Sequence, residues 1–342
     1  MKSVRWRAGA VIRRSASCVF VLALSALTGC SSIQIKMGMK VSLAKLPVAS
    51  IEASLPKDPG IAPGEKSPLV VTVTETDGTV QVTQGKGKGK VLWSDLTVTP
   101  TVVTVNKKGV LSLDRDPRVS DGKTGHVAIT VPSHPGVSTE LDIPLRYNYA
   151  FASNFSGASG SDGLNGSSGQ DGISGSPGSF DPNNPSPGGD GSSGSNGSDG
   201  GNGGNGGDGG DGPPVQVWAT LRAGSHPLLQ IGVTSPGHKE RFYLVDPQGG
   251  SLTVNDDGGS GGSGGKGGAG GRGGAGGIGT PNGSNGSDGQ SGHDGSAGSA
   301  GRGGSIAMTY DPAVQPYLAA IHLSSPGGPA PVLKQAPVAA LW

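Results

Sequence analysis

The chain has 342 residues, of which 66 are glycine and only 32% are hydrophobic, and its 26 basic and 25 acidic residues leave a net charge of +1. A charge this close to zero does not support a broad nucleic-acid footprint. Its two cysteines, Cys18 and Cys30, both lie near the start, so disulfides and cysteine metal sites are excluded from the rest of the chain.

The first 29 residues have the pattern of a secretion signal. Basic residues precede an apolar stretch at 16–27, which is short for a membrane span and ends in Leu-Thr-Gly-Cys at 27–30. This ending resembles the lipobox of bacterial lipoproteins, which implies cleavage between Gly29 and Cys30 and attachment of acyl chains such as palmitate to Cys30. A signal that is cleaved without lipidation is the alternative.

Loss of this signal would change both the charge and the location of the protein. The signal holds five basic and no acidic residues, so the remaining chain has 21 basic and 25 acidic residues and a net charge of −4. Acyl chains on Cys30 would give stable membrane anchoring, with 30–40 as a lipidated tether. By resemblance to Gram-negative lipoproteins, Ser31 in place of aspartate after the cysteine implies an outer-membrane destination.

Residues 41–150 are predicted to form an antiparallel β domain. Apolar and polar residues alternate in 69–74, 127–131 and 141–149, as expected for strands with one buried face. Glycine-containing pairs such as Asp77-Gly78 separate the strands as turn signals. Seven or eight short strands at this spacing predict a β-sandwich.

The same region resembles the bacterial Ig-like domains of group 2 over about 80 residues. The resemblance rests on Pro-Gly-Glu at 63–65, Trp-Ser-Asp at 93–95, the stretch 105–110 and the strand 125–131. It implies a surface-protein spacer or adhesion module. In such a sandwich Trp93 would be a structural core residue.

Four glycine-repeat tracts dominate the region 151–324. Each tract places glycine at every third position for seven or eight triplets, and the tracts lie at 157–178, 188–212, 258–279 and 283–304. Because the sequence around them is typical of β strands, each pair of tracts is predicted to leave and re-enter one β base as a rod–turn–rod finger.

The remaining parts of this region carry two further expectations. Segments 242–245 and 252–254 flank the turn-forming residues 246–250, which predicts a β-hairpin. The tail 325–342 is rich in proline and alanine and is expected to be loose.

Three physical states compete for the glycine tracts. Gly/Ser-rich sequence can be a disordered coil, and each glycine loses about 0.5–1 kcal/mol more than alanine when it is ordered. A collagen triple helix needs many prolines, but Pro177 is the single proline at a triplet position. A bundle of polyproline-II-type rods would bring glycine edges together and allow backbone groups to pair between rods.

The bundle hypothesis predicts which rods are central, because a Gly-Gly-Xaa rod offers two bare edges and a Gly-Xaa-Yaa rod offers one. Tract 258–279 and the segment 200–211 are Gly-Gly-Xaa and should lie inside. The glycines that we expect to be structural in this packing are Gly258, Gly261, Gly264 and Gly267. Such a bundle resembles those of springtail antifreeze proteins and some phage tail-tip adhesins.

No catalytic or metal-binding motif is recognisable in the chain. The nearest phosphate-loop match, ending at Lys266, lacks the serine or threonine that would hold magnesium, and no pair of histidines has metal-ligand spacing. The acidic glycine runs lack the apolar residue of calcium-binding nonapeptide repeats. Polar residues there are interpreted as solubilising, with at most weak cation attraction at Asp208, Asp211, Asp256 and Asp257.

These features predict an all-β, lipid-anchored protein of the cell envelope with a structural, spacer or adhesive role. We expect no enzymatic activity and no cofactor. The expected contacts are the membrane, through the acyl chains, and a cell-surface protein or polysaccharide, but not nucleic acid. The alternative is a glycan- or surface-binding module that uses the flat face of the glycine-rich bundle.

Overall fold

The structure, a computed structural model, describes residues 34–35, 37–179, 183, 189–222, 224 and 226–342. The chain divides into two compact units, Met1–Tyr147 and Asn148–Trp342, close to the predicted boundary at residue 150. The regular secondary structure of both units is mostly β, in several small sheets with few helices, which confirms the all-β class in its coarse form.

Three small antiparallel sheets make up the described part of the first unit. Their strand orders are β1 (Val48–Ser54), β3 (Val70–Glu75), β4 (Val80–Val82); β2 (Lys66–Pro68), β7 (Val110–Leu113), β6 (Val103–Val105); and β5 (Thr97–Thr101), β8 (Gly125–Thr130), β9 (Ser138–Ile143). Short helical segments connect them: η1 (Leu43–Lys45), η2 (Gly85–Gly87), η3 (Trp93–Asp95) and α2 (Pro117–Ser120). This arrangement does not by itself establish an Ig-like sandwich.

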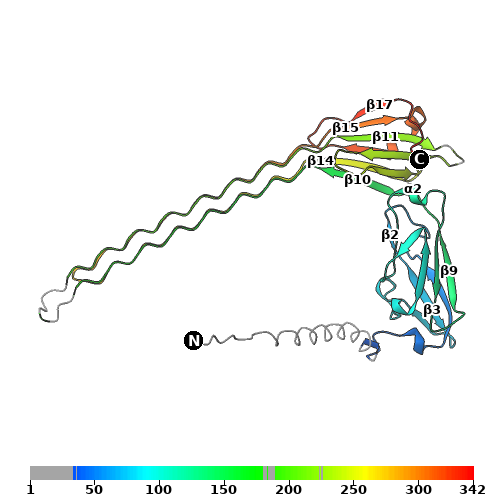
Figure 1. The fold of residues 1–342 in the computed structure, drawn as a ribbon, viewed down its shortest axis with the longest axis horizontal. Helices are drawn as coiled ribbons and strands as arrows, with labels where there is room; N and C mark the ends of the chain where they lie inside the picture. The colour runs from blue at the N-terminus through cyan, green and yellow to red at the C-terminus, as the bar shows by residue number, and fades with distance from the viewer. Residues whose placement is uncertain (1–33, 36, 180–182, 184–188, 223, 225) are drawn as a thin grey trace, which may run out of the picture. The chain divides into compact units, whose positions relative to one another are not determined.

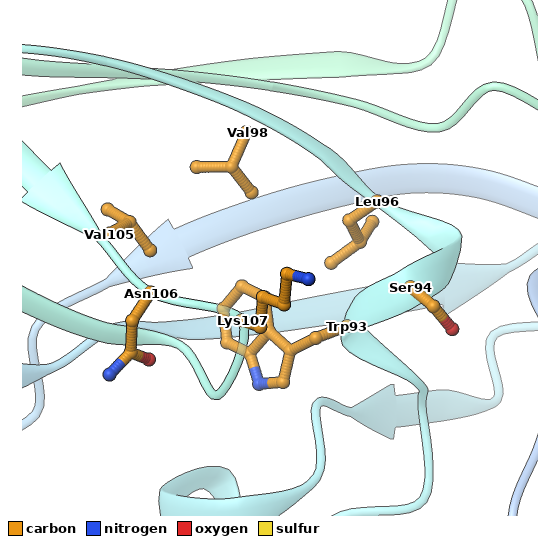
Figure 2. Close-up of a pocket in the computed structure, with 7 residues that line it drawn as sticks. All are labelled: Trp93, Ser94, Leu96, Val98, Val105, Asn106 and Lys107. Carbon is orange, nitrogen blue, oxygen red and sulfur yellow. The ribbon is translucent and has the colours of Figure 1, made fainter. Parts of the chain in front are cut away.

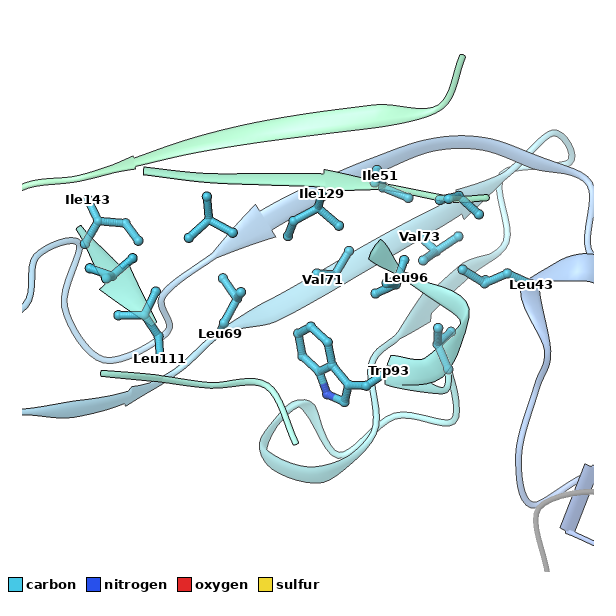
Figure 3. Close-up of a cluster of buried hydrophobic side chains, with 14 of the residues drawn as sticks. Leu43, Ile51, Leu69, Val71, Val73, Trp93, Leu96, Leu111, Ile129 and Ile143 are labelled. Atoms are coloured by element: carbon cyan, nitrogen blue, oxygen red, sulfur yellow. The ribbon is translucent and has the colours of Figure 1, made fainter. Parts of the chain in front are cut away.

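One hydrophobic core lies between these sheets (Figure 3). The alternation of β3 directs Val71 and Val73 inward, where they meet Leu111 and Ile129 from the other two sheets. Trp93 is 7% exposed in this core, and its Nε1 donates a hydrogen bond to the carbonyl of Gln84 at 3.3 Å. The prediction that Trp93 is a core residue is confirmed.

The second unit contains one three-stranded and one five-stranded sheet. The first is wholly parallel, with the order β10 (Ala150–Ser156), β14 (Ser251–Asp257), β16 (Ile321–Ser324). The second is mixed, with the order β13 (Arg241–Val245), β12 (Leu228–Thr234), β11 (Val215–Arg222), β15 (Ile306–Tyr310), β17 (Val332–Gln335). The 3-10 helix η4 (Pro312–Ala320) joins β15 to β16. The sheets touch where Tyr243 packs on Phe151, with ring centroids 6.0 Å apart.

The predicted hairpin around 246–250 is wrong, because β13 and β14 belong to different sheets. β14 instead lies parallel to β10, with Leu252 opposite Phe151. This pairing places side by side the two strands that lead into the glycine tracts 157–178 and 258–279. The parallel pairing of β10 with β14, which brings these two tracts together, is therefore formed in place of the hairpin that the turn residues 246–250 suggested.

The C-terminal tail is also not loose, contrary to the expectation. β17 extends the five-stranded sheet by pairing with β15, and the last residues lie on β11 and β12. Thr220 donates to the carbonyl of Val338 at 3.0 Å, and Trp342 packs edge-on against Phe242. Because this tail covers one face of β12, nearly every residue of that strand is buried.

The four glycine tracts run side by side away from these sheets as extended rods (Figure 1). Rod 1 (157–178) continues β10 and rod 3 (258–279) continues β14, whereas rod 2 (189–212) leads into β11 and rod 4 (283–304) into β15. The single β base that was predicted is thus two sheets, one for the outgoing rods and one for the returning rods.

A first prediction concerns the turn at Gly109, whose φ is +70° and whose added Cβ would lie 2.0 Å from Cζ2 of Trp93. We expect Gly109→Ala to lower the free energy of unfolding by about 2–4 kcal/mol, from the left-handed backbone and the clash together. Scanning calorimetry would measure this loss. The control is Gly78→Ala, because Gly78 has φ +84° and nothing within 4 Å. Equal losses in both variants would contradict the packing of Trp93 described above.

Candidate functional site: the glycine-rich bundle

Backbone hydrogen bonds join the four rods at every third residue. Glycine N–H groups of rod 1 donate to carbonyls of the parallel rod 3, from Gly160 and Ser260 to Gly178 and Ile278, at 2.7–2.8 Å. Rods 2 and 4 form a second parallel ladder, and three antiparallel ladders join rod 2 to rod 1, rod 3 to rod 2 and rod 4 to rod 3. The backbone groups that a rod cannot satisfy internally are therefore satisfied between rods.

This bonding pattern places rods 2 and 3 at the centre of the bundle. Each of them is bonded to three other rods, whereas rods 1 and 4 are each bonded to two. The inner position predicted for 258–279 and 200–211 is confirmed. The disordered coil and the collagen triple helix do not describe these tracts, because the rods are ordered by hydrogen bonds within one chain and several of them pair antiparallel.

Rod 3 needs its two bare edges because a neighbouring backbone approaches each of them. A Cβ added to Gly258, Gly261, Gly264 or Gly267 would lie 2.0 Å from a carbonyl oxygen of rod 4. The next glycine of each triplet faces rod 1 in the same way, and a Cβ on Gly262 would lie 2.0 Å from the carbonyl oxygen of Ser161. Side chains are thus excluded from two of every three positions.

Rod 2 has one crowded edge and one edge that accepts serine. A Cβ on Gly203 would lie 2.1 Å from the carbonyl oxygen of Gly265, whereas a Cβ on Gly204 would meet nothing closer than 3.2 Å. Earlier in rod 2, serine occupies the position equivalent to Gly204. There the hydroxyl of Ser195 accepts the N–H of Ile173 at 2.7 Å. An inner rod therefore does not need Gly-Gly-Xaa throughout.

Asparagine and aspartate side chains satisfy backbone N–H groups that no rod carbonyl reaches. In rod 2 the third residue of six successive triplets accepts an N–H of rod 4 at 2.6–3.0 Å: Asn196, Asp199, Asn202, Asn205, Asp208 and Asp211. Rods 1 and 4 make the same contact to rod 3 through Asp162, Asn165, Asp171, Asn285, Asp288 and Asp294.

This set of contacts corrects the interpretation of Asp208 and Asp211 as solubilising residues. Their Oδ1 atoms accept the N–H groups of Ser299 and Arg302, so they hold rod 4 against rod 2. Sequence reasoning missed this role, although Asn or Asp at every third position of one tract was a signal that could have found it.

The outer surface of the bundle is mostly polar but carries exposed apolar side chains. Leu164 and Ile173 occupy the same triplet position of rod 1 and are 84% and 80% exposed. Lys266 and Asp294 form an exposed ion pair at 2.6 Å, whose hydrogen bond raises the pKa of Lys266 and lowers that of Asp294. Exposed pairs of this kind contribute little to stability.

Outside the bundle, the first unit has an open groove of about 450 Å³ beside Trp93 (Figure 2). The other lining residues are Ser94, Leu96, Val98, Val105, Asn106 and Lys107. Its walls are apolar, and Asn106 is engaged in its own turn by accepting the N–H groups of Lys108 and Val110. The hydroxyl of Ser94 donates to its neighbour Asp95 at 3.4 Å.

The described residues also contain no group of three or more His, Cys, Asp or Glu side chains that could hold a metal ion. None of the helices in the described ranges is long and apolar enough to cross a bilayer. Gly29 and Cys30, the predicted cleavage and lipidation residues, lie outside these ranges.

Comparison with known proteins gave no family model, no curated protein and no solved structure that matches this chain.

A second prediction uses the two kinds of glycine in rod 2. We expect Gly203→Ser to lower the free energy of unfolding of the second unit by about 2–4 kcal/mol, because its Cβ would displace the backbone of rod 3. Gly204→Ser should leave stability unchanged or raise it by up to about 1 kcal/mol, because it removes a flexible glycine and can accept the N–H of Leu164. Calorimetry of the full chain would compare them. Equal losses in both variants would contradict the bundle geometry.

Proposed function

We propose that the protein is a lipid-anchored, non-catalytic component of a bacterial cell envelope, with the glycine-rich bundle as a stiff structural or adhesive arm. The observation that carries this proposal is the set of five backbone ladders that run along the rods. At about 3.1 Å per residue, a rod of 22 residues spans about 70 Å. An arm of this length with a mostly polar surface is better suited to bridging a distance and contacting a partner than to catalysis.

The first unit would serve as a spacer in this proposal. Its antiparallel pairs, such as β5 with β8, and the burial of Trp93 support an Ig-like assignment. The basic start, short apolar stretch and Cys30 support the anchor, with outer-membrane placement inferred from Ser31.

A third prediction tests the anchor by metabolic labelling with a fatty-acid analogue in a bacterial host that processes lipoproteins. We expect label on the wild-type protein, none on Cys30→Ser, and accumulation of the unprocessed precursor with globomycin, because Cys30 would be the acylated residue. The matched control is Cys18→Ser, which should be labelled as the wild type. Label that persists in Cys30→Ser, or an unlabelled wild type, would overturn the anchor.

A second candidate function is binding of a glycan or another surface by the bundle itself. Exposed Leu164 and Ile173 on one rod favour it, because contact with a surface would remove their apolar area from water. Binding to purified envelope polysaccharide that is retained by wild type and lost by the double variant Leu164→Ser, Ile173→Ser would favour this function. Equal binding by both would remove the bundle face from recognition.

A further inference from the structure

Asp256 is a fully buried carboxyl group where the rods join the sheets. Alternate residues of β14 point inward, so Leu252, Val254 and Asp256 are all 0% exposed. Neither carboxyl oxygen of Asp256 has a hydrogen-bond partner within the described chain. The interpretation of Asp256 as a solvated residue is therefore wrong, and the alternation of its strand was the signal that it is inside.

The side chain of Asp256 fills the space left by two glycines at the ends of rods 2 and 4. A Cβ added to Gly304 would lie 2.3 Å from Oδ2 of Asp256, 2.4 Å from the carbonyl oxygen of Gly212 and 2.5 Å from that of Pro213. A Cβ on Gly212 would lie 2.5 Å from Oδ1. The carboxyl oxygens thus lie against the bare edges of two glycines, in a space closed to solvent. Burial without a hydrogen-bond partner disfavours the ionised carboxylate relative to the neutral acid.

We propose that Asp256 is a proton-dependent latch of the bundle: as the neutral acid it holds the ends of rods 2 and 4 against β14, and its ionisation loosens this junction. The latch goes beyond the proposed function, because it concerns the second unit alone and needs neither the anchor nor a ligand.

Among the described groups around the junction, none forms an ion pair with Asp256. Asp257 follows it in β14, and Asp211 and Arg302 flank the two rod ends, where the N–H of Arg302 donates to Asp211. Phe155 of β10 lies opposite Asp256, and Arg241 of β13 stacks 4.5 Å from that ring while it donates to Ser153 and Asn154. From the side of β16, the hydroxyl of Ser325 donates to the carbonyl of Gly304.

This environment fixes the direction of the pH dependence. Burial, and next the repulsion from Asp257, raise the pKa of Asp256 from 3.8 to about 6, and the nearby N–H of Gly304 offsets part of the shift. The folded chain therefore binds this proton more tightly than the unfolded chain. The resulting stability is fully present below about pH 4 and is lost as the pH rises through 6, a fall of about a hundredfold in the folding equilibrium.

A fourth prediction tests the latch by equilibrium unfolding of the full chain between pH 4.5 and 8. We expect wild type to lose stability in the second unit as the pH rises, and Asp256→Asn to keep it, with a folding equilibrium about a hundredfold higher than wild type at pH 7.5. The control is Asp199→Asn, which keeps its acceptor oxygen in rod 2 and should follow wild type. An Asp256→Asn variant that loses stability with pH as wild type does would overturn the proposal.

A second measurement keeps the proposal testable if Asp256→Asn does not fold. The side-chain carboxyl ¹³C shift of Asp256 in the wild-type protein should titrate near pH 6, together with faster amide exchange at Gly212 and Gly304 above that pH after correction for the intrinsic rate. A carboxyl that is already ionised at pH 4.5 would overturn the latch. Stabilisation of wild type at pH 7.5 by added calcium chloride, absent in Asp256→Asn, would also overturn it and indicate a bound cation instead.

Discussion

The structure of the second unit depends on backbone hydrogen bonds between glycine-rich rods. A rod of this period has no internal hydrogen bonds, so each must find partners in other rods. Each bond contributes about 0.5–1.5 kcal/mol, which is the same order as the extra entropy of about 0.5–1 kcal/mol that each ordered glycine loses. An isolated finger of rods 1 and 2 would have one ladder for two rods, whereas the bundle has five for four. Four rods are therefore needed for the balance to favour order.

Two further features make this bundle specific. Strand pairing sets the register of the rods. Ser156 lies opposite Asp257 in the sheet, and the N–H of the next residue, Gly157, donates to the backbone carbonyl of Asp257 as the first bond of the ladder between rods 1 and 3. Asparagine and aspartate side chains add a second set of contacts at many of the N–H groups that reach no backbone carbonyl. These side-chain contacts help to fix which rods are neighbours.

Much of this organisation could be predicted from the sequence, and the failures have physical causes. The glycine period predicted the rods and which of them are inner or outer. This was possible because a rod edge without Cβ atoms is an edge that a neighbouring backbone can approach closely. The division of the base into two sheets could not be predicted, because it follows from parallel pairing of β10 with β14, nearly a hundred residues apart in the chain. The fold of the tail was missed because its partners, such as Phe242 for Trp342, lie about a hundred residues earlier in the chain and come together only in the folded sheet.

The most direct test of the inter-rod hydrogen bonds is residue-resolved amide hydrogen exchange along rod 1 in the full chain. In its first half, the N–H groups of Gly160, Gly163 and Gly166 donate to carbonyls of rod 3, whereas the N–H groups of the residues between them donate to no backbone carbonyl within the described structure. The account predicts slow exchange at these glycines and fast exchange between them, a protection pattern with a period of three. Uniformly fast exchange along the rod would contradict it.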